Sequence, residues 1–134
     1  MIVLRVVAAL YALSGLWCLF QSETAAAYVG YGASSSVAAA EFFTVYGGIQ
    51  LGLGLAMWLG AKIERYQEAT LFFAMVFSLV LVTARVISFV VYPNALDHMG
   101  AWVMAELEAV IAISLVIAHI KAGRREQSLH GSAI

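Results

Sequence analysis

Besides Arg5 near the start of the chain, four charged side chains lie within stretches of the sequence that are otherwise apolar: Glu41, Arg85, Glu106 and Glu108. Carboxylates and a guanidinium that meet away from water can clamp two helices together, hold a ligand, or exchange protons with a substrate. A charge that is buried alone is costly, so each of these groups needs a partner. The chemistry open to this chain therefore depends on which of the four side chains the fold brings together.

The composition is too apolar for a water-soluble domain. Of the 134 residues, 63% are hydrophobic and 11% are charged, against roughly 45–50% and 25% in soluble domains. So few charges cannot cover a surface that faces water, which excludes a soluble domain, a disordered chain and a nucleic-acid-binding protein. The single cysteine, Cys18, allows no intrachain disulfide and no Cys-rich zinc site. The sequence predicts an integral membrane protein with no metal site and no cofactor.

Four apolar runs are long enough for transmembrane helices, each of which needs about 20 mostly apolar residues. They cover about residues 2–20, 39–60, 69–92 and 100–120. We expect a single all-α domain over residues 1–134, an antiparallel bundle of four transmembrane helices. The start of the chain also resembles a signal peptide, but the first run is long enough to span and is expected to be a retained helix. The segment 21–38 should form a short interfacial helix or lid, or a plain surface loop.

The basic residues predict how the bundle lies in the membrane. With four spans, both termini lie on the same side as the connection between the second and third spans. Six of the seven Lys and Arg residues fall on that side, and none falls in the connections 21–38 and 93–99. The positive-inside rule therefore predicts that both termini are cytoplasmic.

Depth estimates predict a partner for Arg85. With a rise of about 1.5 Å per residue, Arg85 lies roughly 10 Å below the outer surface and Glu106 roughly 9 Å below it. Glu41 opens the second span and lies a few ångströms deep. The third and fourth spans are neighbours joined by a turn at Pro93-Asn94, so we expect Arg85 to pair with Glu106.

Helical spacing assigns the remaining polar side chains. Glu108 lies about 200° around the helix from Glu106, so it should face another seam, near Tyr11 and Ser14. Gln50 lies near the middle of the membrane, where it is expected to form a hydrogen bond with another helix. The third span carries one polar stripe in an otherwise apolar helix: Ser78, Arg85, Ser88 and Tyr92.

The charges around Arg85 do not balance, because three glutamates face one arginine. In a low dielectric, either a carboxyl group is protonated or a cation occupies the site. Intramembrane charges most often serve function, so we interpret this cluster as a ligand site in the outer leaflet. The alternative is a structural clamp that fixes helix register. The expected ligand-binding residues are Glu41, Arg85, Ser88, Trp102 and Glu106.

The second span carries the small-residue motif Gly48-x-x-x-Gly52. Small residues at this spacing let two helices approach closely in a membrane. We expect the motif to support close packing within the bundle. The alternative is a seam between copies of this chain, which would make a homo-oligomer, or a contact within a larger membrane complex.

Several short motifs together resemble a bacterial membrane-protein family, domain of unknown function 4345. They are Glu41 followed by Tyr46-Gly47-Gly48, then Arg85-Val86-Ile87-Ser88, and Ala105-Glu106-Leu107. The resemblance covers nearly the whole chain and implies a four-helix protein of the bacterial inner membrane. It marks Glu41, Arg85, Ser88 and Glu106 but implies no activity. Where the family often has an arginine after the helix-two glutamate, this chain has Phe42-Phe43-Thr44.

Four functions remain open, in this order. The first is binding of a membrane lipid or a small amphipathic or cationic molecule in the Glu/Arg pocket. The second is an accessory subunit of a larger membrane complex. The third is a membrane enzyme in which Glu106 or Glu41 is the general acid/base for a lipid-like substrate. The fourth is a small transporter, which the lack of a carboxylate in the first span disfavours.

Overall fold

The computed structural model describes residues 1–32 and 35–131, with side chains up to residue 124. Every element in these ranges is helical, and none of the residues described forms a strand, so the all-α prediction is confirmed. In chain order the elements are α1 (Ile2–Phe20), α2 (Ser22–Tyr28), α3 (Ser36–Phe42), the π-helix η1 (Phe43–Ile49), α4 (Gln50–Lys62), the 3₁₀-helix η2 (Glu64–Tyr66), α5 (Gln67–Val91), the 3₁₀-helix η3 (Pro93–Asp97) and α6 (Met99–Gly131).

Four helical stretches are long and apolar enough to cross a membrane, which confirms the four predicted spans. The second begins near residue 36, earlier than expected, because the Ser35 hydroxyl accepts a hydrogen bond from the Ala38 N–H at 3.2 Å and caps the helix. Residues 22–28 form α2, so within segment 21–38 the plain-loop alternative is wrong for these residues, whereas residues 29–32 form no helix. The four stretches are Ile2–Phe20, Ser36–Lys62, Glu64–Val91 and Met99–Arg124.

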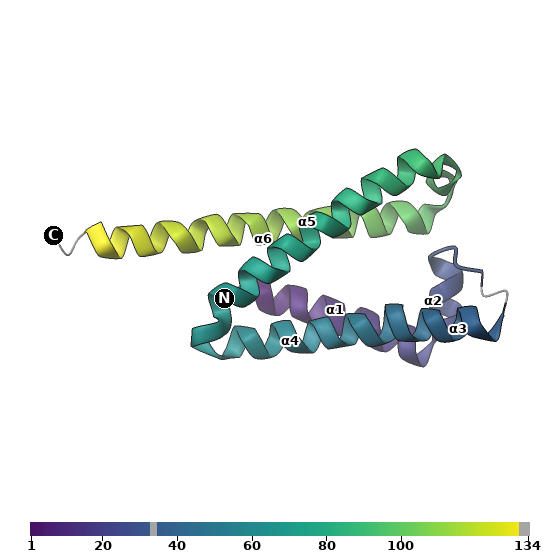
Figure 1. Cartoon of the computed structure of the whole chain (residues 1–134), viewed down its shortest axis with the longest axis horizontal. Coiled ribbons are helices and arrows are strands. Elements are labelled where there is room, and N and C mark those ends of the chain that lie inside the picture. Colours follow the sequence, from purple (N-terminus) through teal and green to yellow (C-terminus); the bar gives the residue numbers. More distant parts are fainter. Residues whose placement is uncertain (33–34, 132–134) are drawn as a thin grey trace.

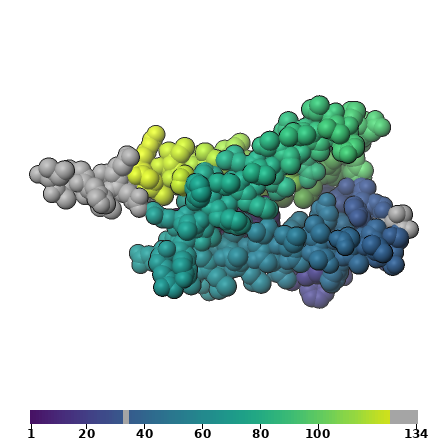
Figure 2. Space-filling view, in the orientation of Figure 1, coloured from purple at the N-terminus to yellow at the C-terminus, as the bar shows by residue number. Residues whose placement is uncertain are grey.

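The spanning helices pack as two pairs, α1 with α4 and α5 with α6 (Figure 1). The N-terminus, η2 and the end of α6 lie at one end of the molecule, here termed the terminal end. The opposite end carries α2, the start of α3 and η3, and is termed the hairpin end. The pairs diverge toward the hairpin end, and Figure 2 shows an opening between them there.

Two apolar cores hold these helices together. The larger lies toward the terminal end, where all four spans meet, and the smaller joins α1, α2 and α3 at the hairpin end. The polar side chains discussed below lie between the two cores. The larger core contains Leu4, Val7, Ala8, Met57, Ala61, Leu71, Ala74, Ile111 and Leu115. The smaller contains Cys18, Ala25, Ala26 and Phe42.

Glycines bring α1 and α4 into backbone contact. A Cβ atom on Gly15 would lie 2.5 Å from the Leu51 nitrogen, and one on Gly54 would lie 2.5 Å from the Ala12 nitrogen. Close backbone approach of this kind is how small residues stabilise helix pairs in membranes.

The expectation that Gly48 and Gly52 support packing within the bundle is wrong. In the part of the chain that the structure describes, no atom lies within 4 Å of a Cβ built on either glycine. They lie on a different face of the helix from Gly47 and Gly54, which pack against α1. A seam between copies of this chain at Gly48 and Gly52 stays a prediction.

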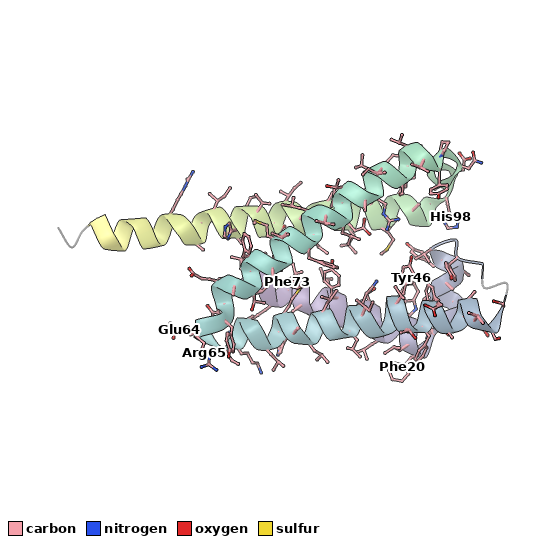
Figure 3. The ribbon with its side chains drawn as sticks, viewed as in Figure 1. Phe20, Tyr46, Glu64, Arg65, Phe73 and His98 are labelled. Atoms are coloured by element: carbon pink, nitrogen blue, oxygen red, sulfur yellow. The ribbon has the colours of Figure 1, made fainter. Side chains whose placement is uncertain are left out.

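Basic side chains gather at the terminal end, where Arg65 and Glu64 lie at the turn between α4 and α5 (Figure 3). The Arg65 guanidinium carbon is 4.5 Å from the centroid of the Tyr66 ring, and Lys62 Nζ is 5.7 Å from that of Trp58. Paired aromatic and basic side chains are typical of a membrane interface.

We therefore expect both termini to be cytoplasmic. A reporter that is active only in the periplasm should be inactive when fused after Ile134, and a reporter active only in the cytoplasm should work there. Fusions truncated after Asn94, at the hairpin end, should give the reverse pattern and serve as the control. Periplasmic activity of the Ile134 fusion would contradict this orientation.

Candidate functional site

A bidentate ion pair joins α5 to α6. Arg85 donates from Nε to Glu108 Oε2 at 2.9 Å and from Nη2 to Glu108 Oε1 at 2.7 Å. The Glu108 side chain is only 8% exposed, whereas that of Arg85 is 31% exposed. Paired parallel hydrogen bonds between a guanidinium and a carboxylate are among the strongest that side chains make. This pair is therefore a strong polar contact between α5 and α6.

The prediction that Arg85 pairs with Glu106 is wrong. Glu106 is exposed and makes no hydrogen bond or ion pair with any residue that the structure describes. Helical side chains lean toward the N-terminus of their own helix. Since α5 runs toward the hairpin end, Arg85 leans away from that end and meets a residue further along α6. Glu108 is that residue, and it shares the buried face of α6 with Ile111 and Leu115.

The site carries balanced charges, unlike the cluster expected from the sequence. Glu41 in α3 is exposed like Glu106, and neither lines the cavity that Glu108 lines. One carboxylate therefore faces one guanidinium. No surplus negative charge remains at the ion pair to attract a cation.

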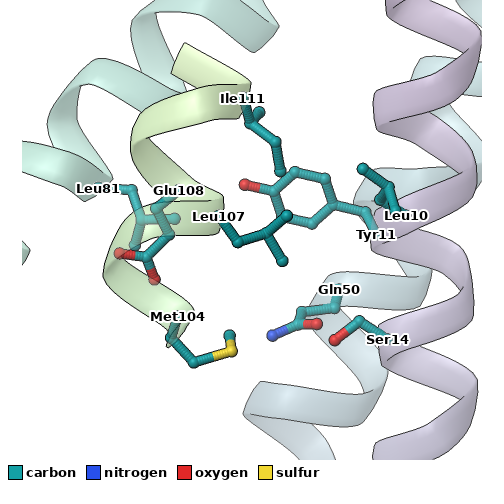
Figure 4. A pocket seen from close by; sticks show the side chains of 9 residues that line it. All are labelled: Leu10, Tyr11, Ser14, Gln50, Leu81, Met104, Leu107, Glu108 and Ile111. Carbon is teal, nitrogen blue, oxygen red and sulfur yellow. The ribbon is translucent and has the colours of Figure 1, made fainter. Parts of the chain in front are cut away.

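A cavity of about 60 Å³ lies beside this ion pair and is termed the central pocket. All four spans contribute to it. Its polar groups are the Tyr11 and Ser14 hydroxyls, the Gln50 amide and the Glu108 carboxylate, and its walls are Leu10, Leu81, Met104, Leu107 and Ile111 (Figure 4).

The prediction that Glu108 faces a seam apart from Arg85 is wrong, since Glu108 is the partner of Arg85. Tyr11 and Ser14, the residues expected near Glu108, do line the central pocket with it. The Tyr11 hydroxyl points toward α6, and the Gln50 amide and the Ser14 hydroxyl lie next to each other below it (Figure 4). Side chains from α1 and α4 thus present hydrogen-bonding groups to the pocket from the side opposite α6. A hydrogen bond from Gln50 to another helix stays a prediction.

A buried hydroxyl adjoins this cluster. Ser78 on α5 is 1% exposed, and its Oγ atom has no hydrogen-bond partner among the residues described. Ser78 and Glu108 both lie close enough to Tyr11 to influence its hydroxyl. Buried hydroxyls normally find a partner, and the Tyr11 hydroxyl is the one that lies close to Ser78.

The central pocket adjoins an apolar groove between α1 and α6. Three side chains, Leu10, Leu107 and Ile111, line both. The groove has a volume of about 210 Å³ and extends toward the terminal end as far as Ile2 and Val3. We term it the α1–α6 groove. Its other lining residues are Val6, Val7, Val110 and Ser114.

Of the five residues expected to bind a ligand, only Arg85 belongs to the ion pair. Ser88 lies one turn further along α5, where its hydroxyl donates to the Arg85 carbonyl at 2.7 Å. Trp102 Nε1 donates to the Leu96 carbonyl at 2.9 Å, and its ring packs on Phe89. Both side chains stabilise their own helices or the α5–α6 turn. Neither lines the central pocket.

Gln50 was not expected at the site, and Glu108 was expected in a seam apart from Arg85. One pattern in the sequence could have placed Glu108 beside Arg85. Met104, Glu108, Ile111 and Leu115 recur at helical spacing on α6, which marks a face turned toward the bundle. A carboxylate on that face is the natural partner for an arginine on the adjacent helix.

The family comparison agrees with the resemblance found in the short motifs. The family model of the domain of unknown function DUF4345 matches residues 1–119. The chain belongs to the DUF4345 family. No curated protein and no solved structure matches this chain.

The DUF4345 region contains every residue of the central pocket and both members of the ion pair. It ends within α6, so only the last part of that helix lies beyond it. The Arg85–Glu108 pair, the central pocket and the α1–α6 groove therefore all lie within the part of this chain that the family model matches.

Proposed function

We propose that this protein binds a lipid-like amphiphile, with the polar head in the central pocket and the chain in the α1–α6 groove. The observation that carries the proposal is that the two cavities are adjacent, since Leu10, Leu107 and Ile111 line both. A small recess with polar groups beside a longer apolar groove matches the head and chain of an amphiphile. The compartment that we propose for this protein is the bacterial inner membrane. The amphiphile would enter the groove laterally from the bilayer.

The balanced ion pair supports a neutral head group rather than a cation. Arg85 already neutralises Glu108 through two hydrogen bonds. A cation would lose its hydration without gaining an unpaired carboxylate, which is unfavourable in a low dielectric. A hydroxyl or an amide, in contrast, can bond to Tyr11, Ser14 and Gln50. The expected class is therefore a long-chain alcohol, amide or similar neutral amphiphile.

The test is photolabelling of the purified full chain in lipid nanodiscs. The probe is a long-chain alcohol with a photoreactive diazirine in its chain, compared with a trimethylammonium probe of the same chain. The alcohol should label α1 and α6 peptides, and the ammonium probe should label them less. Gln50→Leu removes one hydrogen-bonding group from the pocket and should reduce labelling by the alcohol about threefold to tenfold.

A matched control is available on α5. Thr83 is exposed, and its hydroxyl bonds to the Leu79 carbonyl of its own helix at 2.8 Å. Thr83→Val therefore removes a polar group outside the pocket and should leave labelling unchanged. Equal labelling of the Gln50→Leu and Thr83→Val proteins would contradict the proposal, as would stronger labelling by the ammonium probe.

A further inference from the structure

A second cavity reaches Arg85 from the hairpin end. Its volume is about 130 Å³, and we term it the vestibule. It lies between the end of α2, η1, α5 and the first turn of α6. Among the residues that the structure describes, Arg85 is the only charged one that lines it, and Tyr31 and Tyr46 also line it. Tyr46 points from η1 toward the α5–α6 pair (Figure 3).

The ion pair separates the vestibule from the central pocket. Arg85 lines the vestibule and Glu108 lines the central pocket, whereas Met104 lines both. The two cavities are therefore distinct, and they present different chemistry. The cationic member of the pair, Arg85, lines the vestibule, and the anionic member, Glu108, lines the central pocket.

Two glycines place backbone at the wall of this cavity. Gly30 adopts a φ of 75°, in the left-handed region that favours glycine. The first turn of α6 packs directly against the Tyr28 carbonyl, where a Cβ on Gly100 would collide with it. His98 lies close to both glycines, and Figure 3 shows it at the hairpin end. Gly30 and Gly100 both line the vestibule, so backbone forms part of its wall.

The Arg85 guanidinium has donors to spare. Of its five N–H groups, Glu108 takes one on Nε and one on Nη2. Nη1 has no hydrogen-bond partner among the residues that the structure describes. Three N–H groups thus remain, and the side chain is 31% exposed. A second oxygen-rich anion can bind such a guanidinium alongside the first.

We propose that the vestibule binds a carboxylate or phosphate group on the N–H groups of Arg85 that Glu108 leaves free. The Tyr31 and Tyr46 hydroxyls would donate to the same group. The first turn of α6 adds the partial positive charge of a helix N-terminus. The anion is either that of a small molecule in solution or that of a lipid headgroup at this face of the membrane.

The test uses the accessibility of an engineered thiol to charged reagents. The single native cysteine, Cys18, is buried and is replaced by alanine. Ala101→Cys then places a thiol in the vestibule lining, and Asn94→Cys places the matched control on exposed η3 at the same end. The full chain in phosphatidylcholine nanodiscs reacts with an anionic or a cationic methanethiosulfonate. Both reagents attack the same thiolate, so the ratio of their rates is independent of thiol reactivity.

We expect the anionic-to-cationic rate ratio to be about tenfold higher at position 101 than at position 94. In the Arg85→Ala/Glu108→Gln background, which removes both charges, the ratio at 101 should fall to that at 94. Protection of the thiol by inorganic phosphate would identify a dissolved anion as the source. Protection only when phosphatidylglycerol is added to the nanodisc would identify a lipid headgroup.

Two results would overturn the vestibule proposal: equal ratios at the two positions, or a raised ratio without protection by either anion. The amphiphile proposal is tested separately, because Gln50 does not line the vestibule. Gln50→Leu should leave thiol protection unchanged while it reduces labelling by the alcohol probe. Failure of one proposal is therefore distinguishable from failure of the other.

Discussion

Arg85→Ala should destabilise the protein by about 3–5 kcal/mol, the usual range when one member of a buried ion pair is removed. The substitution leaves Glu108, which is only 8% exposed, without its two hydrogen bonds. The double substitution Arg85→Ala/Glu108→Gln removes both charges and should be clearly more stable than Arg85→Ala alone. Thermal unfolding of the purified proteins in one detergent measures the difference.

The neighbouring glutamate supplies the control for this experiment. Glu106 lies two residues away on the same helix and is exposed. Arg85→Ala/Glu106→Gln should therefore be as unstable as Arg85→Ala, because the stranded carboxylate at position 108 remains. Recovery of stability by Glu106→Gln equal to that by Glu108→Gln would show that the pairing described here is not the one that stabilises the fold.

Gly54→Ala should also be strongly destabilising, by about 1–3 kcal/mol, as expected for overpacking. The new Cβ would lie 2.5 Å from the Ala12 nitrogen and 2.8 Å from the Ala8 carbonyl oxygen. Both atoms belong to the α1 backbone, so the helices must separate. Gly52→Ala meets no described atom within 4 Å and should be neutral or stabilising by up to about 1 kcal/mol, since alanine favours helix.

The same unfolding measurement compares these two alanine substitutions, which lie on one helix and differ only in the face they alter. Gly15→Ala tests the seam from the other side, because its Cβ would lie 2.5 Å from the Leu51 nitrogen. It should resemble Gly54→Ala. Equal effects at positions 52 and 54 would contradict the packing of α1 against α4.

The membrane-spanning architecture could be predicted because it depends on composition and run length alone. Four apolar runs separated by polar turns allow one arrangement of spans, and the spans in the structure begin or end within a few residues of those expected. The need of Arg85 for a carboxylate partner on the next helix followed from the cost of burying a charge. That expectation was met, with a different carboxylate.

The choice between Glu106 and Glu108 could not be made from depth alone. The depth of a residue was estimated from the backbone rise along its helix. Whether two side chains meet depends also on the direction in which they lean and on the angle at which α5 crosses α6. The same limitation applies to Gly48 and Gly52. Their spacing matches a packing motif, but Gly47 and Gly54 face α1, since the face is set by how the helix enters the bundle.

The π-helix η1 has a consequence for which changes in chain length this protein can tolerate. One π turn is equivalent to a single residue inserted into an α-helix. Buried Gly47, Gly54 and Ala61 recur at seven-residue steps, but buried Phe42 precedes Gly47 by only five. Deleting one residue between Phe42 and Gly47 would restore an ordinary α-helix, in which the two lie four residues apart and still share a face. Phe42, whose ring now stacks on that of Tyr46 at 4.7 Å between ring centroids, would therefore stay in the smaller core, and the glycines that face α1 would keep their register. Among related sequences, insertions and deletions in this helix should therefore concentrate at this turn.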